Sequence, residues 1–501
     1  MKKSICYSVL SLFLLLFCFD SNAQYSKKKL KKYFLNNFQL LNYEGGGVFA
    51  CHNVNFEGTD TNFLHSQIQG DFSNVDKHHY LIKKQEITNV EYKEFVDWVR
   101  DSMYRETLYL QGFKQYGVPI KGMDAFGRNY QINWKTKIDF KDENIIKALQ
   151  VFYYDENSLY YNKKEHDNSK LVYAFIDESA PNTVINKIPV YPDTLCWIRE
   201  FMHYDYYNLE YDYSAYYFWH PAFNNYPVVG VNWYQTQAFC HFFTKQTQDR
   251  LSYFFGEKIK AFRLPTEMEW MNSADIDIMN PCSTDFYFNS DGTAINVNMG
   301  SVEDKNGLII NNSNNKDQTI MNLSKAMEPN SKGISNLHGN VAEWLQDSLD
   351  LPNLNSKAHI FQVPFYYDEL SFVDTLFWLS FDVNKQIKSI PRLMSTQFGS
   401  DLPNYEDTVY TLSYSTMLSI ENLLPEVDKM IESIKNDQNI LEKMPNSRII
   451  KGGSWNDPLI YLLPQTRALQ QANAATATTG FRIVLPLTEK QELKIRELNK
   501  K

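Results

Sequence analysis

The stretch Ile449-Ile450-Lys451-Gly452-Gly453-Ser454-Trp455 lies in the C-terminal part of the chain, and Gly480-Phe481-Arg482 follows it. Glycine has no Cβ atom, so two successive glycines permit positive φ angles and a close approach of another part of the backbone. We therefore interpret Gly452 and Gly453 first as a backbone feature. For the charged residues around this turn, the simplest interpretation is buried ion pairing; these residues are Asp457, Arg467 and Arg482.

Four more motifs precede this stretch. They are QEITNVEYKEF (Gln85 to Phe95), PVVGVNW (Pro227 to Trp233), RLPTEMEW (Arg263 to Trp270) and GNVAEW (Gly339 to Trp344). The first three each contain or begin a helix-start signal, in which Thr or Asn is followed three residues later by Glu or Gln, and the two side chains cap each other's backbone N–H groups. The pairs are Thr88/Glu91, Asn232/Gln235 and Thr266/Glu269. These signals predict scaffold helices and say little about catalysis.

The chain around the first motif predicts a strand followed by a core helix. Residues 79–87 alternate enough to form the strand. After Thr88, one apolar face recurs at helical spacing and predicts burial of Tyr92, Phe95, Val96, Val99 and Met103.

Together and in this order, the motifs resemble the formylglycine-generating-enzyme/sulfatase-modifying-factor family. The resemblance implies an α+β fold, related to C-type lectins, with little regular secondary structure and, here, two long insertions. Oxidases of that family carry two cysteines three and eight residues beyond the serine. Counting from Ser454, those places hold Asp457 and Leu462. Neither side chain binds copper(I) as a thiolate, so we expect a degenerate site, no copper and no oxidase activity.

The same resemblance implies a calcium site in the stretch that contains GNVAEW. Its ligands would be the Asn336 side chain, the carbonyls of Gly339 and Val341, and the Glu343 carboxylate. Calcium takes six to eight oxygen ligands, often from irregular backbone and a carboxylate, and this stretch offers both. The alternative is that Glu343 caps or pairs internally while Trp344 packs in the core.

The N-terminus predicts export. Lys2 and Lys3 precede a short apolar run and then Ala23, which is typical of a signal peptide cleaved after residue 23. Bulky Phe17 before Cys18 argues against lipidation at that cysteine. The expected organisation is a signal peptide at 1–23, a leader at 24–42, a core at 43–344 with an insert at 104–219, an insertion at 345–447, the end of the core at 448–487 and a charged tail at 488–501.

Composition excludes one class of partner. The formal net charge is −9 and no basic stripe is present, which argues against nucleic-acid binding. Four cysteines follow the predicted signal peptide and allow three disulfide pairings; they are Cys51, Cys196, Cys240 and Cys282. Cys240 lies in an apolar run that favours a buried, inert thiol.

A narrower resemblance rests on two blocks, Tyr191-Pro192-Asp193-Thr194-Leu195-Cys196-Trp197-Ile198-Arg199-Glu200-Phe201 and Tyr217-Phe218-Trp219-His220-Pro221-Ala222-Phe223. With the first motif they resemble the gliding-motility K and J lipoproteins and PorK of the type IX secretion system of Bacteroidota. This resemblance implies a non-catalytic structural component that forms or joins a periplasmic ring at the outer membrane. The implied partners of such an oligomeric assembly are an N-type ring protein and outer-membrane components.

Two other functions stay open at this point. The chain would be a metal-dependent oxidase if a ligand cluster lined a pocket near Trp455 and Arg482. It would be a lectin-like binding module if its tyrosine-rich loops, including residues 203–219, presented aromatic rings to glycans or peptides.

Overall fold

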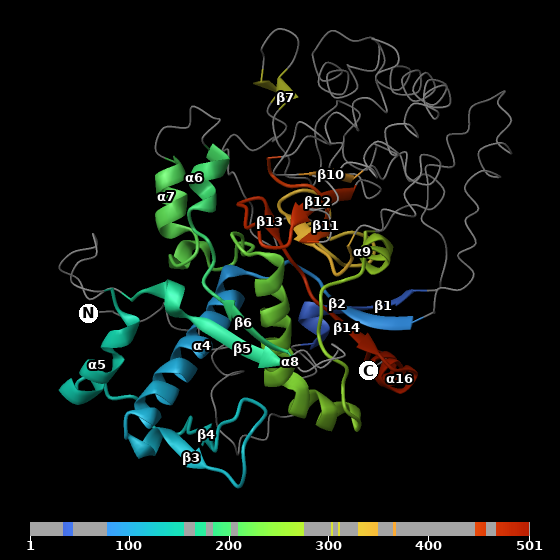
Figure 1. Cartoon of the computed structure of the whole chain (residues 1–501). Coiled ribbons are helices and arrows are strands. Elements are labelled where there is room, and N and C mark those ends of the chain that lie inside the picture. Colours follow the sequence, from blue (N-terminus) through green and yellow to red (C-terminus); the bar gives the residue numbers. More distant parts are fainter. Residues whose placement is uncertain are drawn as a thin grey trace, which may run out of the picture. The chain divides into compact units, whose positions relative to one another are not determined.

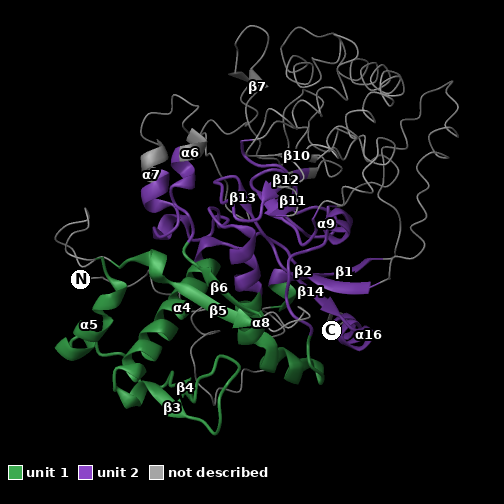
Figure 2. Ribbon diagram, viewed as in Figure 1, with its two compact units in different colours: residues 1–36, 91–191, 241–259 green, residues 37–90, 192–240, 260–501 purple. Residues whose placement is uncertain are grey.

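The computed structural model describes residues 34–43, 78–154, 166–176, 184–201, 209–274, 302–303, 309–310, 329–348, 364–366, 446–456 and 467–499. The chain divides into two compact units, which Figure 2 colours green and purple. Unit 1 comprises residues 1–36, 91–191 and 241–259, and unit 2 comprises residues 37–90, 192–240 and 260–501. Both units mix helices and strands, as the sequence predicts (Figure 1).

Unit 2 contains two larger sheets, with strand orders β1-β2-β14 and β10-β12-β11-β9-β13. Their strands are β1 (Phe38–Tyr43), β2 (His78–Lys83), β9 (Ala342–Trp344), β10 (Pro364–Tyr366), β11 (Ser447–Lys451), β12 (Arg467–Gln471), β13 (Thr479–Gly480) and β14 (Val484–Leu487). A small pair is formed by β7 (Val302–Glu303) and β8 (Ile309–Ile310). Among the described residues, the helical elements that lie wholly in unit 2 are α6 (Cys196–Phe201), α7 (Leu209–Tyr216), η4 (Pro221–Phe223), α9 (Glu267–Ser273) and α16 (Glu489–Asn499).

The five-stranded sheet brings three of the sequence motifs together. Strand β9, from GNVAEW, pairs antiparallel with β11, so that Lys451 lies opposite Glu343. Strand β13 pairs parallel with the other side of β9 and places Gly480 opposite Glu343. Segments more than a hundred residues apart thus meet at one strand, and this position determines the site described below.

Unit 1 includes most of α4 (Asn89–Leu110) and the part of α8 (Trp233–Phe255) from His241 onward. Its other elements are η1 (Lys114–Tyr116), β3 (Gly117–Pro119), β4 (Tyr130–Ile132), α5 (Glu143–Leu149), η2 (Gln150–Phe152), η3 (Asn168–Lys170), β5 (Val172–Ile176) and β6 (Ile185–Pro189). The hairpins β3-β4 and β5-β6 are both antiparallel. One apolar cluster packs Tyr104 and Leu108 of α4 with Leu149 and Phe152.

The predicted helix after Thr88 is confirmed. Tyr92, Phe95, Val96 and Val99 of α4 are buried, and Phe95 makes an edge contact with the ring of Tyr173 at 5.4 Å between centroids. The apolar face therefore packs in a core, as its spacing predicts.

Two of the predicted capping pairs are also confirmed. Thr266 and Glu269 form a reciprocal capping box at the start of α9. At the start of α8, Gln235 N donates to Asn232 Oδ1 and Asn232 N donates to Gln235 Oε1, at 3.0 and 2.8 Å. The local signals thus fix where these helices begin.

The predicted strand at 79–87 is shorter than expected. Strand β2 ends at Lys83, because the chain then turns and Lys84 N donates to Asn37 O. Beyond the turn, Ile87 exchanges backbone hydrogen bonds with other segments: its N–H donates to Phe481 O, and its carbonyl accepts from Val228 N.

The segment predicted as a leader, 24–42, ends in a core strand. Phe38–Tyr43 forms β1, pairs antiparallel with β2, and buries Phe38 and Tyr43. Strand β2 begins 35 residues after the end of β1, so no local sequence pattern predicts that the two strands pair.

The segment predicted as a charged tail, 488–501, forms helix α16. Most of its residues are charged or polar, but one face of the helix is buried, and Gln491 and Ile495 lie on that face four residues apart. Thr488 and Gln491 cap its start in the same reciprocal manner as the other helices. In the parts of the chain that are described, no helix combines the length and apolar character needed to cross a bilayer.

Candidate functional site

The two glycines of the GGSW stretch form a left-handed turn that lies directly against a second turn. Gly452 and Gly453 have φ angles of 95° and 62°. Gly339 N donates to Gly452 O at 2.7 Å, and Trp455 N donates to Asn340 O at 2.8 Å. A Cβ atom on Gly452 would lie 2.7 Å from the carbonyl oxygen of Leu337. The predicted backbone role of these glycines is therefore confirmed.

At the centre of the site, Glu343 and Arg482 form a buried ion pair. Both side chains are essentially inaccessible to solvent. Arg482 Nε donates to the two carboxylate oxygens at 2.8 and 2.6 Å, and Nη2 also contacts Oε1. Trp270 Nε1 donates to Oε2 at 2.9 Å. The interpretation of Arg482 as a member of a buried ion pair is confirmed, with Glu343 as its partner.

The remaining donors of Arg482 bind backbone carbonyls. Nη1 donates to Lys83 O at 3.1 Å and Nη2 donates to Ser335 O at 3.0 Å. One guanidinium therefore joins β9, the end of β2 and the turn before Asn336. A planar group with five donors suits such a junction, where a lysine would supply one point charge.

A second buried carboxylate, Glu86, lies beside this pair. Asn336 Nδ2 donates to both of its oxygens at 3.1 Å, and Asn340 Nδ2 donates to Oε1 at 2.8 Å. Burial raises the pKa of the Glu86 carboxyl to about 7; the charge of Arg482 opposes this shift and that of Glu343 adds to it. Sequence reasoning did not single out Glu86, although it lies within the first motif, because its partner residues are about 250 positions away.

The residues predicted to bind calcium lie together, but their arrangement does not fit a cation as it stands. Asn336 Oδ1 is buried without a hydrogen-bond partner, as a ligand oxygen would be. Both oxygens of Glu343, however, accept from a fixed guanidinium, whose positive charge would repel a second cation at the same carboxylate. A calcium ion would have to displace Arg482 there. Calcium binding stays an untested prediction of the sequence, which the pairing of Glu343 with Arg482 argues against. That pairing instead favours the alternative, in which Glu343 pairs internally.

Ion pairs also surround the pair Glu343–Arg482. Lys451, which is fully buried, pairs with Glu267 at 3.1 Å. Arg263 donates to both oxygens of Glu269 at 2.6 and 2.8 Å, and His78 Nε2 lies 2.9 Å from Oε1. Burial alone would raise the pKa of Glu269, but its hydrogen bonds with His78 and Arg263 outweigh burial and lower that pKa to about 2. In the described ranges, no three His, Cys, Asp or Glu side chains form a group that could hold a metal.

The serine of the GGSW stretch directly precedes a tryptophan that belongs to an aromatic cluster. Ser454 is fully buried, and its Oγ accepts from Asn456 N at 3.2 Å. Trp455 stacks on Trp197 with 6.0 Å between ring centroids, and Trp455 Nε1 donates to Ala477 O. We call this group the aromatic cluster; its residues are Cys196, Trp197, Tyr213, Tyr217, Phe223, Tyr226, Val229, Val341, Trp455 and Ala477. Asp457 and Leu462, predicted as degenerate positions, lie outside the described residues.

The aromatic cluster includes a thiol that the sequence does not place there. Cys196 lies in the same buried cluster as Trp455, although more than 250 residues separate them. The side chains of Cys196 and Cys240 are both buried, and burial raises the pKa of the Cys240 thiol. The prediction of an inert thiol at Cys240 agrees with this environment. Cys51 and Cys282 lie outside the described residues.

Comparison with known proteins gives one family and several structures. The model of the sulfatase-modifying factor enzyme 1-like domain matches residues 217–487. No curated protein matches the chain.

Three solved structures illustrate the structural matches. Treponema denticola variable protein 1 is 17% identical, with a TM-score of 0.25 and coverage of 52% of this chain and 72% of that one. PvdO from Pseudomonas aeruginosa is 12% identical, with a TM-score of 0.32 and coverage of 89% and 94%. CarF is 12% identical, with a TM-score of 0.30 and coverage of 90% and 99%. The family match spans more than half of the sequence and ends beyond the arginine that pairs with Glu343, so the chain belongs to the sulfatase-modifying factor enzyme 1-like domain family.

Proposed function

We propose that the protein is a non-catalytic structural component of the type IX secretion and gliding-motility machinery. In this role it forms or joins a periplasmic ring at the outer membrane, with an N-type ring protein and outer-membrane components as partners. It is exported by its signal peptide and attaches peripherally, without an acyl chain on Cys18. An intact-mass measurement of the envelope form tests the last point, because acylation adds a lipid mass.

The observation that carries this proposal is the position of the two blocks behind the narrower resemblance. Trp197 and Phe223, one from each block, pack in the aromatic cluster with Trp455 of the GGSW stretch. The segments that supply the resemblance to ring components therefore pack against Trp455, the residue that follows the serine expected to assist catalysis in the family's oxidases. Asp457 and Leu462 in place of the two cysteines support the same conclusion.

Two exposed aromatic residues in or next to the second block could contact a partner protein. Tyr216 and Trp219 are exposed over about half of their surface and contact each other at 5.7 Å between ring centroids. Exposed tyrosine and tryptophan side chains are the residue types that dominate binding energy in protein interfaces. Their neighbours Tyr213 and Tyr217 pack in the aromatic cluster, so deleting the whole loop would damage the core.

The decisive experiment is affinity purification of the tagged protein from its own envelope, followed by quantitative mass spectrometry. We expect an N-type ring protein and outer-membrane components to be enriched. Replacing both Tyr216 and Trp219 by Ala should lower that enrichment by at least about tenfold, since such residues each contribute on the order of 2 kcal/mol at an interface centre. The matched control is Tyr253→Ala, which removes another exposed aromatic ring.

Two outcomes would overturn the proposal. One is a folded, exported protein that enriches no envelope partner. The other is turnover of a thiol substrate by the purified protein, abolished by Ser454→Ala without loss of folding, which would favour the oxidase. If the double variant instead lost binding to envelope glycans while the ring partners stayed bound, the lectin-like module would describe these aromatic rings better.

A further inference from the structure

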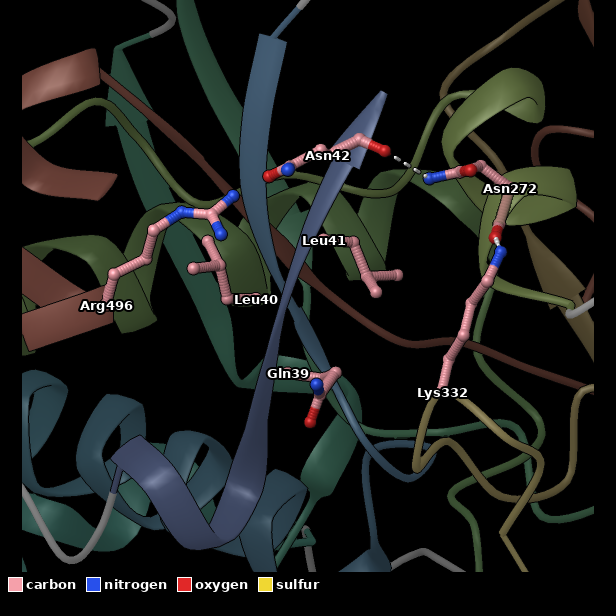
Figure 3. A pocket seen from close by; sticks show the side chains of 7 residues that line it. All are labelled: Gln39, Leu40, Leu41, Asn42, Asn272, Lys332 and Arg496. Atoms are coloured by element: carbon pink, nitrogen blue, oxygen red, sulfur yellow. Dashed lines mark hydrogen bonds between the residues drawn. The ribbon is translucent and has the colours of Figure 1, made fainter. Parts of the chain in front are cut away.

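A cavity of about 600 Å³ lies along strand β1 in unit 2, away from the site described above (Figure 3). Four consecutive strand residues line it, together with three residues from other segments: Gln39, Leu40, Leu41, Asn42, Asn272, Lys332 and Arg496. None of the residues of the GGSW turn or of the Glu343–Arg482 pair lines this cavity. We call it the β1 pocket.

The strand at the β1 pocket is the outermost strand of its sheet. In the described residues β1 pairs with β2 on one side and with no strand on the other. The carbonyl of Asn42 accepts from Asn272 Nδ2 at 3.1 Å, so it is directed away from β2. Backbone groups alternate in direction along a strand, so Leu40, two residues earlier, directs its N–H and C=O to the same outer side. An edge of this kind is a template for another strand.

The charged side chains that line the β1 pocket are both positive. Its lining includes Lys332 and Arg496 and no carboxylate. Lys332 Nζ donates to the carbonyl of Asn272. Arg496 pairs through Nε with Glu492, its side chain is about half exposed, and its terminal nitrogens donate to no other group in the described part of the chain. In Figure 3 the two cationic side chains lie on opposite sides of β1.

We propose that the β1 pocket is a docking site for an extended, acidic segment of a partner protein. The segment adds to β1 as a strand, with main-chain hydrogen bonds to Leu40, and it places a carboxylate against the terminal nitrogens of Arg496. Strand addition supplies affinity through the backbone, and the cations at the rim supply the preference for acidic side chains. This inference names a binding site for the proposed assembly role. It rests on that role in one respect, namely that the occupant of the pocket is a protein.

The test uses the purified full-length mature chain and a short fluorescent peptide of alternating valine and glutamate. We expect saturable binding, measured by fluorescence anisotropy, and at least about tenfold weaker binding of a matched peptide of alternating valine and lysine. A valine-glutamate peptide with alternate backbone nitrogens methylated keeps its charges but loses main-chain donors. It should bind at least about tenfold more weakly if the segment adds as a strand.

Variants of the protein locate the binding. Arg496→Gln should weaken the acidic peptide about tenfold and leave the lysine peptide unchanged. The matched control is Lys490→Gln, which removes an exposed charge from the same helix but not from the pocket lining, and should change neither affinity. Leu40→Pro removes the outward N–H at a position where an edge strand tolerates proline. If that variant fails to fold, the methylated peptide still tests the main-chain contact.

The outcomes separate this inference from the proposed function. If envelope partners are captured but Arg496→Gln and the methylated peptide behave like their controls, the docking inference is wrong and the assembly role stands. If the peptide binds as expected but no envelope partner is captured, the assembly role fails and the site remains. Concentration-dependent self-association that the peptide inhibits would identify a second copy as the occupant, and no peptide binding at all would point to a segment of the chain itself; either result overturns the proposal.

Discussion

The GGSW turn and the β1 pocket belong to the same unit and differ in how completely their polar groups are used. At the turn, two backbones exchange hydrogen bonds, and every oxygen of Glu343 accepts from a fixed donor. At the β1 pocket, one side of β1 pairs with no strand in the described chain, and of the Arg496 nitrogens only Nε donates a hydrogen bond there. The difference separates a closed centre, whose buried polar groups bind one another, from an open edge.

The largest expected effect comes from breaking the central ion pair. Arg482→Met leaves Glu343 buried without its cation, and loss of one partner of a buried pair costs about 3–5 kcal/mol. Urea unfolding followed by circular dichroism measures this change. The matched control is Arg100→Met, since Arg100 pairs with Asp97 on the surface, where such a pair contributes less than about 1 kcal/mol. Equal effects for the two substitutions would contradict a structural centre at Glu343.

A pH titration tests the neighbouring carboxylate, Glu269. Its pKa is lowered in the folded protein to about 2, from 4.5, so its contribution to stability is present above pH 4.5 and is lost as pH falls towards 2. The contribution amounts to roughly 3 kcal/mol. Glu269→Gln should therefore flatten the dependence of the unfolding free energy on pH in that window. An unchanged slope in the variant would show that His78 and Arg263 do not hold this group ionised.

A smaller effect is expected from Gly452→Ala. The added Cβ would meet the carbonyl of Leu337 at 2.7 Å, and the φ angle of 95° is unfavourable for alanine. We expect a loss of roughly 2–3 kcal/mol in unfolding free energy. Gly256→Ala is the control, because that glycine also has a positive φ but open space around it, and should cost only about 1 kcal/mol. If both cost the same, the close approach of the two turns contributes nothing.

The smallest expected effect is that of a chelator. Because Arg482 already occupies the Glu343 carboxylate, we expect EDTA to leave Tm unchanged and added calcium to have no effect. Thermal melting of the mature protein measures this. A ligand that binds only the folded state raises Tm by mass action, so a fall on chelation that calcium restores would establish the calcium site instead.

Local signals in the sequence predict local structure well and long-range partners poorly. The capping pairs at Asn232 and Thr266 fix helix starts because both partners lie within one turn. The turn at Gly452 is also predictable, because two successive glycines are typical of a backbone with positive φ angles. Strand β1 and helix α16 were missed because each is defined by contacts with distant segments, which no short window contains.

The same distinction applies to the candidate site. Glu343 and Arg482 were both singled out, yet 139 positions separate them, and only the five-stranded sheet brings them together. Glu86 and Cys196 were not assigned to the site, because their neighbours come from the far end of the chain. Residue types thus indicate which side chains matter, whereas the fold decides which of them meet.

The most direct test of the central claim is Ser454→Ala in the native organism. The substitution removes one buried hydroxyl that accepts from Asn456 N, so we expect a loss of only about 1 kcal/mol in stability. Secretion and gliding, measured beside the abundance of the exported protein, should match the wild type if this serine is structural. Loss of secretion or gliding by a variant that is folded, exported and present at normal abundance would contradict the structural account and favour an enzyme.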